Sequence, residues 1–233
     1  MLIQEQWSPD QIAGALKELG MESISHETIY QFIYKDLKQN GTLHQHLRHK
    51  VKSYKNRNLK NDKRGHIANQ VSIESRPLEV DLRLSLGHWE IDTIIGKPSG
   101  NVLVTMVERF SRYTLIARAD NKTAEAVTMA LLTRMAPNRD KVKNLTYDNG
   151  KEFAKHLFID DVLGSQGYFA HPYNSWERGL NENTNGLNRQ YFPKRTDFGE
   201  ISDEEIAIVE QKLNRRPRKC LDRKTPNSIF FNN

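Results

Sequence analysis

The feature that most constrains the fold is a run of three β-strand patterns joined by short turns. HWEIDTIIG (88–96), NVLVTMVERF (101–110) and TLIARA (114–119) are rich in the β-branched and aromatic residues that favour strands. The connections between them, KPSG and the SRY tripeptide with its neighbours, are too short for a crossover helix. We therefore expect these strands to form an antiparallel meander.

The chain beyond this meander alternates helix and strand patterns. We expect a helix over 123–135, a strand over 144–148, a helix over 153–163, a short strand over 167–170, a helix over about 176–191 and a long helix that starts at Ser202 with Glu205 as its capping-box partner. Three antiparallel strands followed by helix–strand–helix–strand–helix is the element order of a ribonuclease H-like fold. We therefore predict an α/β domain with a mixed sheet over residues 81–233.

Residues 1–47 have a helical pattern and form a separate region. Ser8 is an N-cap candidate, Pro9 occupies the first helical position and Gln11 completes a capping box. Gly20 is expected to end this helix, and Ser25 is expected to cap a second one. The tight turn between them fits a helix-turn-helix, and it fits an ordinary αα-hairpin equally well.

The second helix of this region has two different faces. Ile29, Phe32 and Ile33 form its expected apolar face, and the opposite side carries Glu27, Gln31, Tyr34 and Lys35. In a helix-turn-helix the second helix enters the major groove of DNA. Gln31 and Lys35 are therefore candidate DNA contacts.

A strongly basic strip follows at residues 48–64. It holds eight Lys/Arg and one Asp, a net charge of +7, whereas the whole chain carries +6. Such a local excess of positive charge is typical of a segment that follows a polyphosphate backbone, although a solvated linker or a targeting patch has the same composition. We expect a basic linker over 48–80 with candidate nucleic-acid contacts at Arg48, Lys50, Lys52, Lys55 and Arg57.

The composition excludes several other classes of protein. An apolar content of 37% and a charged content of 27% over 233 residues are those of an ordinary globular protein. We expect no membrane span and no secretory signal, since no apolar run is long enough and the start lacks a basic segment before an apolar one. The single cysteine, Cys220, fits a reducing compartment, so we expect a cytoplasmic location. The sequence has no P-loop, and we expect no nucleotide cofactor.

Two aspartates stand out because of their places in the predicted strands. Asp92 lies within the first strand, and Asp148 ends the fourth strand immediately before an Asn149-Gly150 turn signal. Active-site carboxylates of α/β folds lie at the carboxyl ends of core strands. Taken alone, Asp148 fits a cap or turn former as well.

Glu182 is the third candidate, in the unusual helical stretch GLNENTNG. At 100° per residue, one narrow stripe faces the core, and it consists of Leu180, Thr184, Leu187 and Tyr191. The opposite face gathers Glu182 with Arg178, Asn185 and Arg189. A solvated, salt-bridged face is the alternative, but such a face would favour better helix formers than Asn and Gly. We expect the adjacent Asn181 and Asn183 to orient Glu182 or its waters.

Three acids from separate elements, without His or Cys partners, suit hard divalent cations. We expect Asp92, Asp148 and Glu182 to bind Mg²⁺ or Mn²⁺, as two ions that serve phosphoryl transfer. Arg178, Asn185 and Arg189 would then contact DNA phosphates. Four further residues remain open, and we interpret them as structural or hydrogen-bonded rather than catalytic: Glu90, Glu152, His88 and His171.

Several motifs together resemble the transposases of the insertion sequence thirty (IS-thirty) family. They are HWEIDTIIG, TYDNGKEF, HPYNSWERGLNENTNG and LNRRPRKCLDRKTP, with SPDQIAG and ISHETIYQFIY upstream. The resemblance implies an Asp-Asp-Glu catalytic triad on a ribonuclease H-like fold, with 33 residues between the second Asp and the Glu, as between Asp148 and Glu182. It also implies DNA transposition with a divalent metal, in a bacterial cytoplasm and associated with the nucleoid.

The implied partners are double-stranded DNA, both as element ends and as target, and further copies of the chain in a synaptic homo-oligomer. Family members carry a further helix-turn-helix upstream, so the resemblance implies a chain shortened at its N-terminus. One alternative is therefore a shortened DNA-binding copy that represses the intact transposase. Another is a structure-specific nuclease on the same fold, which would leave the helix-turn-helix pattern unexplained.

Overall fold

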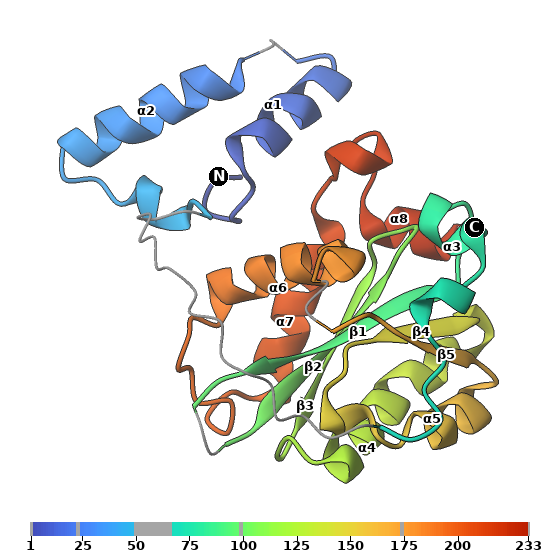
Figure 1. Cartoon of the computed structure of the whole chain (residues 1–233). Helices are drawn as coiled ribbons and strands as arrows, with labels where there is room; N and C mark the ends of the chain where they lie inside the picture. The colour runs from blue at the N-terminus through green and yellow to red at the C-terminus, as the bar shows by residue number, and fades with distance from the viewer. Residues whose placement is uncertain (1, 22–23, 49–66, 98–99, 173–174, 233) are drawn as a thin grey trace. The chain divides into compact units, whose positions relative to one another are not determined.

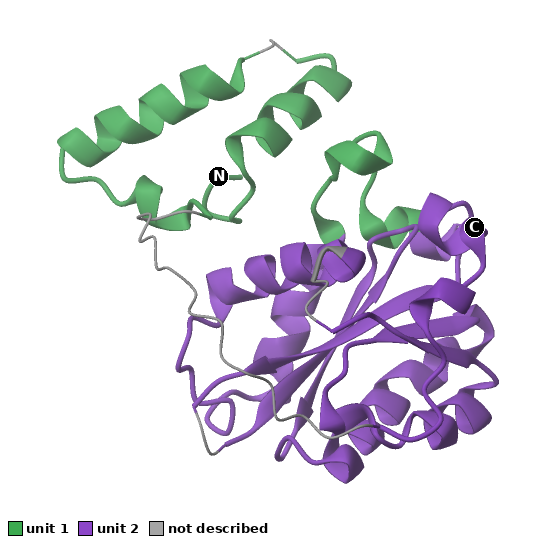
Figure 2. Cartoon of the chain, viewed as in Figure 1, with its two compact units in different colours: residues 1–61, 215–229 green, residues 62–214, 230–233 purple. Residues whose placement is uncertain are grey.

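The computed structural model describes residues 2–21, 24–48, 67–97, 100–172 and 175–232 (Figure 1). The chain forms two compact units, coloured separately in Figure 2. The first comprises residues 1–61 and 215–229, and the second comprises 62–214 and 230–233. The predicted regions 1–47, 48–80 and 81–233 have different bounds and stay a prediction.

The second unit is built on a five-stranded sheet with strand order β3-β2-β1-β4-β5. Its strands are β1 His88–Ile95, β2 Val102–Glu108, β3 Thr114–Ala119, β4 Asn144–Tyr147 and β5 Gln166–Phe169. The first three form the expected antiparallel meander, and β4 and β5 are parallel to β1 and to each other. The mixed sheet confirms the predicted fold class and places β1 at its centre.

The alternation of side chains along β1 separates two hydrophobic clusters on the two faces of the sheet. Trp89 and Ile91 pack with residues of α4 and α5, whereas Ile94 packs with residues of α6 and α7. Figure 1 shows these helix pairs around the sheet. Asp92 has the same parity as Ile94, so its side chain belongs to the face that α6 covers.

The helices of this unit agree with the expected order but begin with short 3₁₀ turns in two places. The predicted helix over 153–163 is a 3₁₀ turn followed by α5, and the one over 176–191 is a 3₁₀ turn followed by α6. The predicted capping box of the last long helix is present, because the Glu205 carboxylate accepts from the Ser202 N–H at 2.8 Å. The elements are α3 Leu78–Leu82, α4 Ala124–Met135, η3 Ala136–Lys141, η4 Lys151–Phe153, α5 His156–Leu163, η5 Ser175–Arg178, α6 Gly179–Tyr191 and α7 Asp203–Arg215.

The first unit contains the expected pair of helices, α1 Pro9–Glu18 and α2 His26–Lys38. Ser8 caps α1 with the reciprocal Gln11 contact, and Ser25 caps α2 by accepting from the Thr28 N–H at 3.1 Å. The Gln11 amide also donates to the Pro217 carbonyl at 2.8 Å, so the C-terminal segment packs on α1 within this unit. That segment includes η6 Lys219–Leu221 and most of α8 Pro226–Phe231, and the unit also contains η1 Leu43–His46.

The expected apolar face of α2 is only partly correct. Ile33 is buried and Ile29 is partly buried, but Phe32 is exposed. Phe32 lies about 100° around the helix from Ile33, which takes it out of a narrow buried stripe. The candidate DNA contacts Gln31 and Lys35 are both exposed.

Residues 67–83 contain regular structure, although a linker was expected to reach residue 80. This segment holds η2 Ile73–Ser75 and α3, and Ser72 forms a parallel bridge with Phe169 of β5. Val80 and Ile67 are buried. The helical elements of this segment, Ile73–Ser75 and Leu78–Leu82, are too short to show the periodicity that would have revealed this packing.

Within the described part of the chain, we find no helix with the length and apolar character needed to cross a membrane.

Candidate active site

Asp92 and Asp148 lie on adjacent parallel strands at the same level of the sheet. The register pairs Glu90 of β1 with Thr146 of β4, and two further residues along each strand lead to Asp92 and Asp148. Neighbouring strands are about 4.8 Å apart, so this register brings the two carboxylates close together. Asp148 follows the last residue of β4, and its Oδ1 accepts from the Gly150 N–H at 2.8 Å, as the turn signal after it predicts.

Arg178 bridges these two carboxylates. Its guanidinium lies 3.6 Å from Asp92 Oδ1 and 3.7 Å from Asp148 Oδ2, and its side chain is 14% exposed. Arg178 is the last residue of η5 and immediately precedes α6. The sequence placed Arg178 beside Glu182 as a DNA contact, whereas the structure places its cationic group between the two aspartates.

The environment of Asp92 raises its pKa to about 6. Burial is the main cause, and the Asp148 and Glu152 carboxylates add to it, while Arg178 and the Thr93 N–H oppose it. Burial disfavours the charged form of a carboxyl group, and a nearby like charge does the same. A cation bound beside Asp92 would favour its charged form and so oppose the effect of burial.

Asn185 and Arg189 attach α6 to the centre of the sheet. The Asn185 amide nitrogen donates to Asp92 Oδ2 at 2.8 Å, and its oxygen accepts from the Thr105 hydroxyl at 3.0 Å. Arg189 donates to the Ile95 carbonyl oxygen at 2.7 Å. Both residues were predicted to share a face with Glu182 and to contact DNA, but their described hydrogen bonds hold α6 against β1 and orient Asp92.

Glu182 is exposed on α6, three residues before Asn185. Residues three apart in a helix share a face, so Glu182 projects from the side of α6 that reaches Asp92. In the parts of the chain that the structure describes, however, no three His, Cys, Asp or Glu side chains are arranged to hold a metal ion. The structure thus brings Asp92 and Asp148 together, and Glu182 lies outside that pair.

The asparagines around Glu182 have different roles from those expected. Asn181 is 1% exposed and Asn188 is fully buried, so both belong to the packed side of α6 together with Leu180, Thr184 and Leu187. The expected stripe was too narrow, since it comprised Leu180, Thr184, Leu187 and Tyr191 and neither of these asparagines. The Asn181 side chain is buried, so it does not take the proposed orienting role. Asn183 is exposed, and its orienting role stays a prediction.

Two of the acids whose roles the sequence left open are buried. Glu90 is fully buried and pairs with Arg109. Glu152 is 4% exposed, accepts from the Thr93 hydroxyl at 2.9 Å and pairs with Lys122 at 2.9 Å. These partners fit the structural interpretation of both acids.

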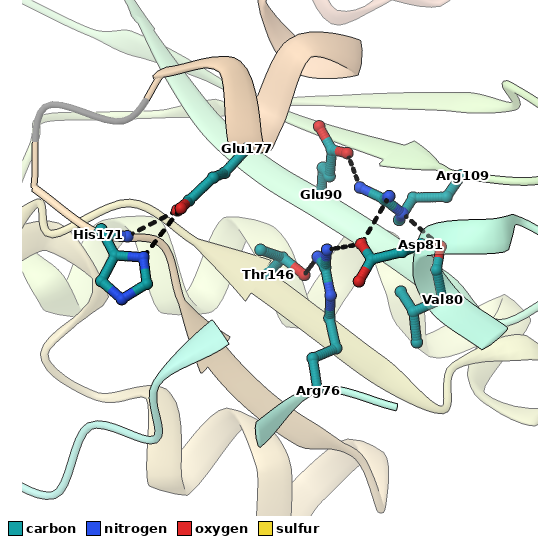
Figure 3. A network of polar contacts seen from close by, with 8 residues as sticks. All are labelled: Arg76, Val80, Asp81, Glu90, Arg109, Thr146, His171 and Glu177. Atoms are coloured by element: carbon teal, nitrogen blue, oxygen red, sulfur yellow. Dashed lines mark hydrogen bonds and ion pairs between the residues drawn. The ribbon is translucent and has the colours of Figure 1, made fainter. Parts of the chain in front are cut away.

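The two histidines also have structural partners. His88 is buried and lies 2.9 Å from the Ser85 hydroxyl, and burial lowers its pKa. His171 Nδ1 lies 2.8 Å from a Glu177 carboxylate oxygen, and this hydrogen bond raises the His171 pKa (Figure 3). Glu177 could not be predicted from the sequence, because no periodicity distinguishes it from the other acids of the chain.

Most of the candidate DNA contacts in the basic strip are not described by the structure. Lys50, Lys52, Lys55 and Arg57 lie outside the described residues. Arg48 is described and exposed. These five residues stay predictions.

Comparisons with known proteins agree with the fold and with the resemblance. A family model described as an integrase core domain matches residues 84–175, which include Asp92 and Asp148. The chain is 43% identical over 229 residues to the transposase for insertion sequence element IS4351 of Bacteroides fragilis, an alignment that covers 98% of this chain and 70% of the relative. It is 39% identical over 241 residues to the transposase InsI for IS30A of Escherichia coli K12, covering 98% and 62% of the two chains.

The fold is also similar to a solved structure. A chain in the cryo-electron microscopy structure of the simian T-cell lymphotropic virus intasome in complex with PP2A regulatory subunit B56 gamma matches with a TM-score of 0.52 and 22% identity, over 74% of this chain and 61% of that one. This similarity concerns the fold, and it agrees with an integrase-type, ribonuclease H-like core.

Proposed function

Because this chain belongs to the IS30 family of insertion-sequence transposases, we propose that it binds the ends of an insertion sequence and catalyses metal-dependent DNA cleavage and strand transfer. The chain spans 62–70% of the length of these two transposases from Bacteroides fragilis and Escherichia coli, so the activity of the whole protein belongs to this proposal. The observation that carries it is the pairing of Asp92 with Asp148 on β1 and β4 beneath a single guanidinium.

The residues at this position fit a divalent cation such as Mg²⁺ or Mn²⁺. Both side chains offer hard carboxylate oxygens, and burial, helped by the like charges of Asp148 and Glu152, raises the pKa of Asp92. Asp92 and Asp148 would hold the metal, with Glu182 supplied by α6. Two bound ions would activate the attacking oxygen and stabilise the leaving oxygen at phosphorus.

The chain's own residues prepare this arrangement. The Asn185 amide and the Thr93 N–H fix the two oxygens of Asp92, and the Gly150 N–H fixes one oxygen of Asp148. The carboxylates therefore hold their orientation without depending on Arg178. Glu182 would join them from the face of α6 that already carries Asn185.

The Arg178 guanidinium lies beside both carboxylates and would compete with a cation for their oxygens. With a divalent ion held by Asp92 and Asp148, the Arg178 guanidinium would be available to pair with a DNA phosphate, which keeps the predicted DNA contact at Arg178 within the proposal. The other proposed contacts are in the α2 helix and the basic strip: Gln31, Lys35, Arg48, Lys50, Lys52, Lys55 and Arg57. Asn185 and Arg189 complete the proposed set at α6.

Replacing Arg178 by Gln should tighten Mn²⁺ binding by about tenfold. Each partly exposed ion pair contributes about 0.2–1 kcal/mol, and the two pairs lost together approach the 1.4 kcal/mol that corresponds to a factor of ten. The measurement is a Mn²⁺ titration followed by electron paramagnetic resonance at fixed pH and low salt. Arg189→Gln is the matched control, because the described contacts of Arg189 go to carbonyl oxygens rather than to carboxylates. Unchanged or weaker Mn²⁺ binding by Arg178→Gln would rule out this competition.

The proposed partners are double-stranded DNA and further copies of the chain. Two element ends must be joined to one target during transposition, so we propose a synaptic homo-oligomer. A cytoplasmic, nucleoid-associated location follows from a DNA substrate in a bacterial cell.

The test of this function is a nicking and strand-transfer assay on duplexes that carry the ends of the source element. We expect Mg²⁺-dependent nicking at the end sequence, loss of nicking with EDTA, and little nicking of a duplex with the same bases in shuffled order. Equal, metal-independent cutting of both duplexes, or DNA binding with no cutting at any metal concentration, would contradict the proposal. The second of these results would favour a DNA-binding repressor.

A further inference from the structure

We propose that four charged residues, the buried Arg76, Glu90 and Arg109 and the exposed Asp81, are positioning residues that align the three acids of the active site. This inference rests on the proposed function, because it assigns these residues a part in metal binding by Asp92, Asp148 and Glu182. Figure 3 shows the network, which we call the alignment network.

Glu90 connects the first acid to the third. Its side chain is fully buried on β1, two residues before Asp92. One carboxylate oxygen pairs with Arg109, and the other accepts from the Asn181 N–H at 3.0 Å. Asn181 is the third residue of α6 and directly precedes Glu182.

This contact provides a cap that α6 otherwise lacks. The N-cap position, Arg178, makes no side-chain capping hydrogen bond, so the first N–H groups of α6 need other acceptors. A carboxylate at a helix N-terminus satisfies such a donor and interacts favourably with the helix dipole. Glu90 thereby fixes the start of α6 to the strand that carries Asp92.

Arg109 connects Glu90 to α3. It is 4% exposed and directly follows β2, and its backbone N–H donates to the His88 carbonyl of β1 at 2.7 Å. Its Nε donates to the Val80 carbonyl at 3.0 Å, and its Nη2 lies 3.4 Å from Asp81 Oδ1. The guanidinium is thus held between the buried Glu90 of β1 and helix α3.

Arg76 completes the connection to the second acid. It is 8% exposed, pairs with Asp81 and donates to the Thr146 hydroxyl at 2.9 Å. Thr146 is fully buried on β4, two residues before Asp148. The alignment network therefore reaches one residue before Glu182 and two residues before each aspartate.

This placement matters because buried charges depend strongly on their partners. Removing one partner of a buried ion pair leaves an uncompensated charge, and its surroundings must rearrange. A rearrangement at Glu90 or Thr146 would move Asp92, Asp148 or the start of α6, and a displacement of about 1 Å at reacting groups can cost about 100-fold in rate. Outer partners of metal ligands typically contribute about 10–100-fold to metal affinity or activity.

The experiment compares Glu90→Gln with Glu210→Gln in the full chain. Glu210 is a close structural match, since it is 6% exposed, accepts from the Ile116 N–H at 2.8 Å and pairs with Arg134. Its contacts join α7, β3 and α4, which carry none of the three acids. Both substitutions keep an acceptor oxygen and remove one buried charge, so a general structural effect should be similar in the two variants.

We expect Glu90→Gln to bind Mn²⁺ about 10–100-fold more weakly than the unchanged chain, whereas Glu210→Gln binds it with unchanged affinity. Excess Mn²⁺ should restore much of the nicking by Glu90→Gln, because the three acids themselves remain. Equal Mn²⁺ affinity in the two variants would overturn the alignment network while leaving the proposed function intact. An unchanged chain that neither binds Mn²⁺ nor nicks DNA would overturn the proposed function and this inference together.

A milder pair of variants keeps the test decisive if Glu90→Gln does not fold. Thr146→Val removes only the hydroxyl that Arg76 contacts, and Thr128→Val is its control. Thr128 is 2% exposed on α4, and its hydroxyl has no hydrogen-bond partner among the described residues. Weaker Mn²⁺ binding in Thr146→Val alone supports the alignment network, and equal binding in both variants overturns it.

Discussion

Replacing Glu182 by Gln should lower Mg²⁺-dependent nicking by about 100-fold or more, with a change in stability within about 0.5 kcal/mol. The stability should hold because Glu182 is exposed, and surface substitutions away from special features have small effects. The loss of activity should be large because the substitution removes a metal ligand, and outer partners of ligands alone contribute about 10–100-fold. The measurements are nicking rates at equal DNA occupancy and urea unfolding of the same samples.

Glu152→Gln is the informative comparison, because Glu152, like Asp148, raises the Asp92 pKa and is the alternative third ligand. It is buried against Thr93 and Lys122, so we expect a loss of about 1–3 kcal/mol in stability. Nicking should stay largely intact at temperatures where the variant is folded. Should the results be reversed, with Glu182→Gln active and folded Glu152→Gln inactive, the third ligand would be Glu152.

Replacing Phe230 by Ala should lower the free energy of unfolding by about 3–5 kcal/mol. Phe230 is fully buried near the C-terminus, stacked on Tyr113 with ring centroids 4.2 Å apart and edge-on to Trp89 at 5.7 Å. Trp89 lies on β1, three residues before Asp92, so this aromatic cluster supports the strand at the centre of the site. Removing the ring leaves a cavity and takes away these contacts.

The neighbouring Phe231 offers a control of the same residue type. It is 57% exposed, so Phe231→Ala should cost about 1 kcal/mol or less. Urea unfolding followed by far-ultraviolet circular dichroism measures both variants. Similar midpoints for the two would show that burial of Phe230 does not stabilise the core to the expected degree.

The sequence predicted those features that depend on local pattern. The three-strand meander followed from β-branched residues and short turns, and the caps at Ser8, Ser25 and Ser202 followed from residue type and spacing. The positions of Asp92 and Asp148 relative to their strands were also predictable, since each is defined by the strand around it. Their proximity required the pairing of β1 with β4, which the predicted fold class implied.

The arrangement around α6 could not be predicted in the same way. Helical periodicity gives the angle of each side chain but not the contacts that it makes, so Arg178 and Asn185 were assigned to Glu182 although they reach Asp92. Asn181 was expected to orient Glu182 or its waters, but tertiary packing buries its side chain, and Asn188 is buried as well. Glu90 and Arg109 are 19 residues apart in sequence, and no local pattern indicates their pairing.

The central claim is that Asp92, Asp148 and Glu182 bind one metal centre, and iron-directed cleavage of the polypeptide tests it most directly. Fe²⁺ binds oxygen ligands of the same kind as Mg²⁺ and Mn²⁺, and with ascorbate and peroxide it generates radicals that cut the backbone near the bound ion. We predict cuts close to all three acids in the unchanged chain and their joint loss in Asp148→Asn. Cuts near Asp92 and Asp148 without any near Glu182, or cuts that persist in Asp148→Asn, would contradict the claim.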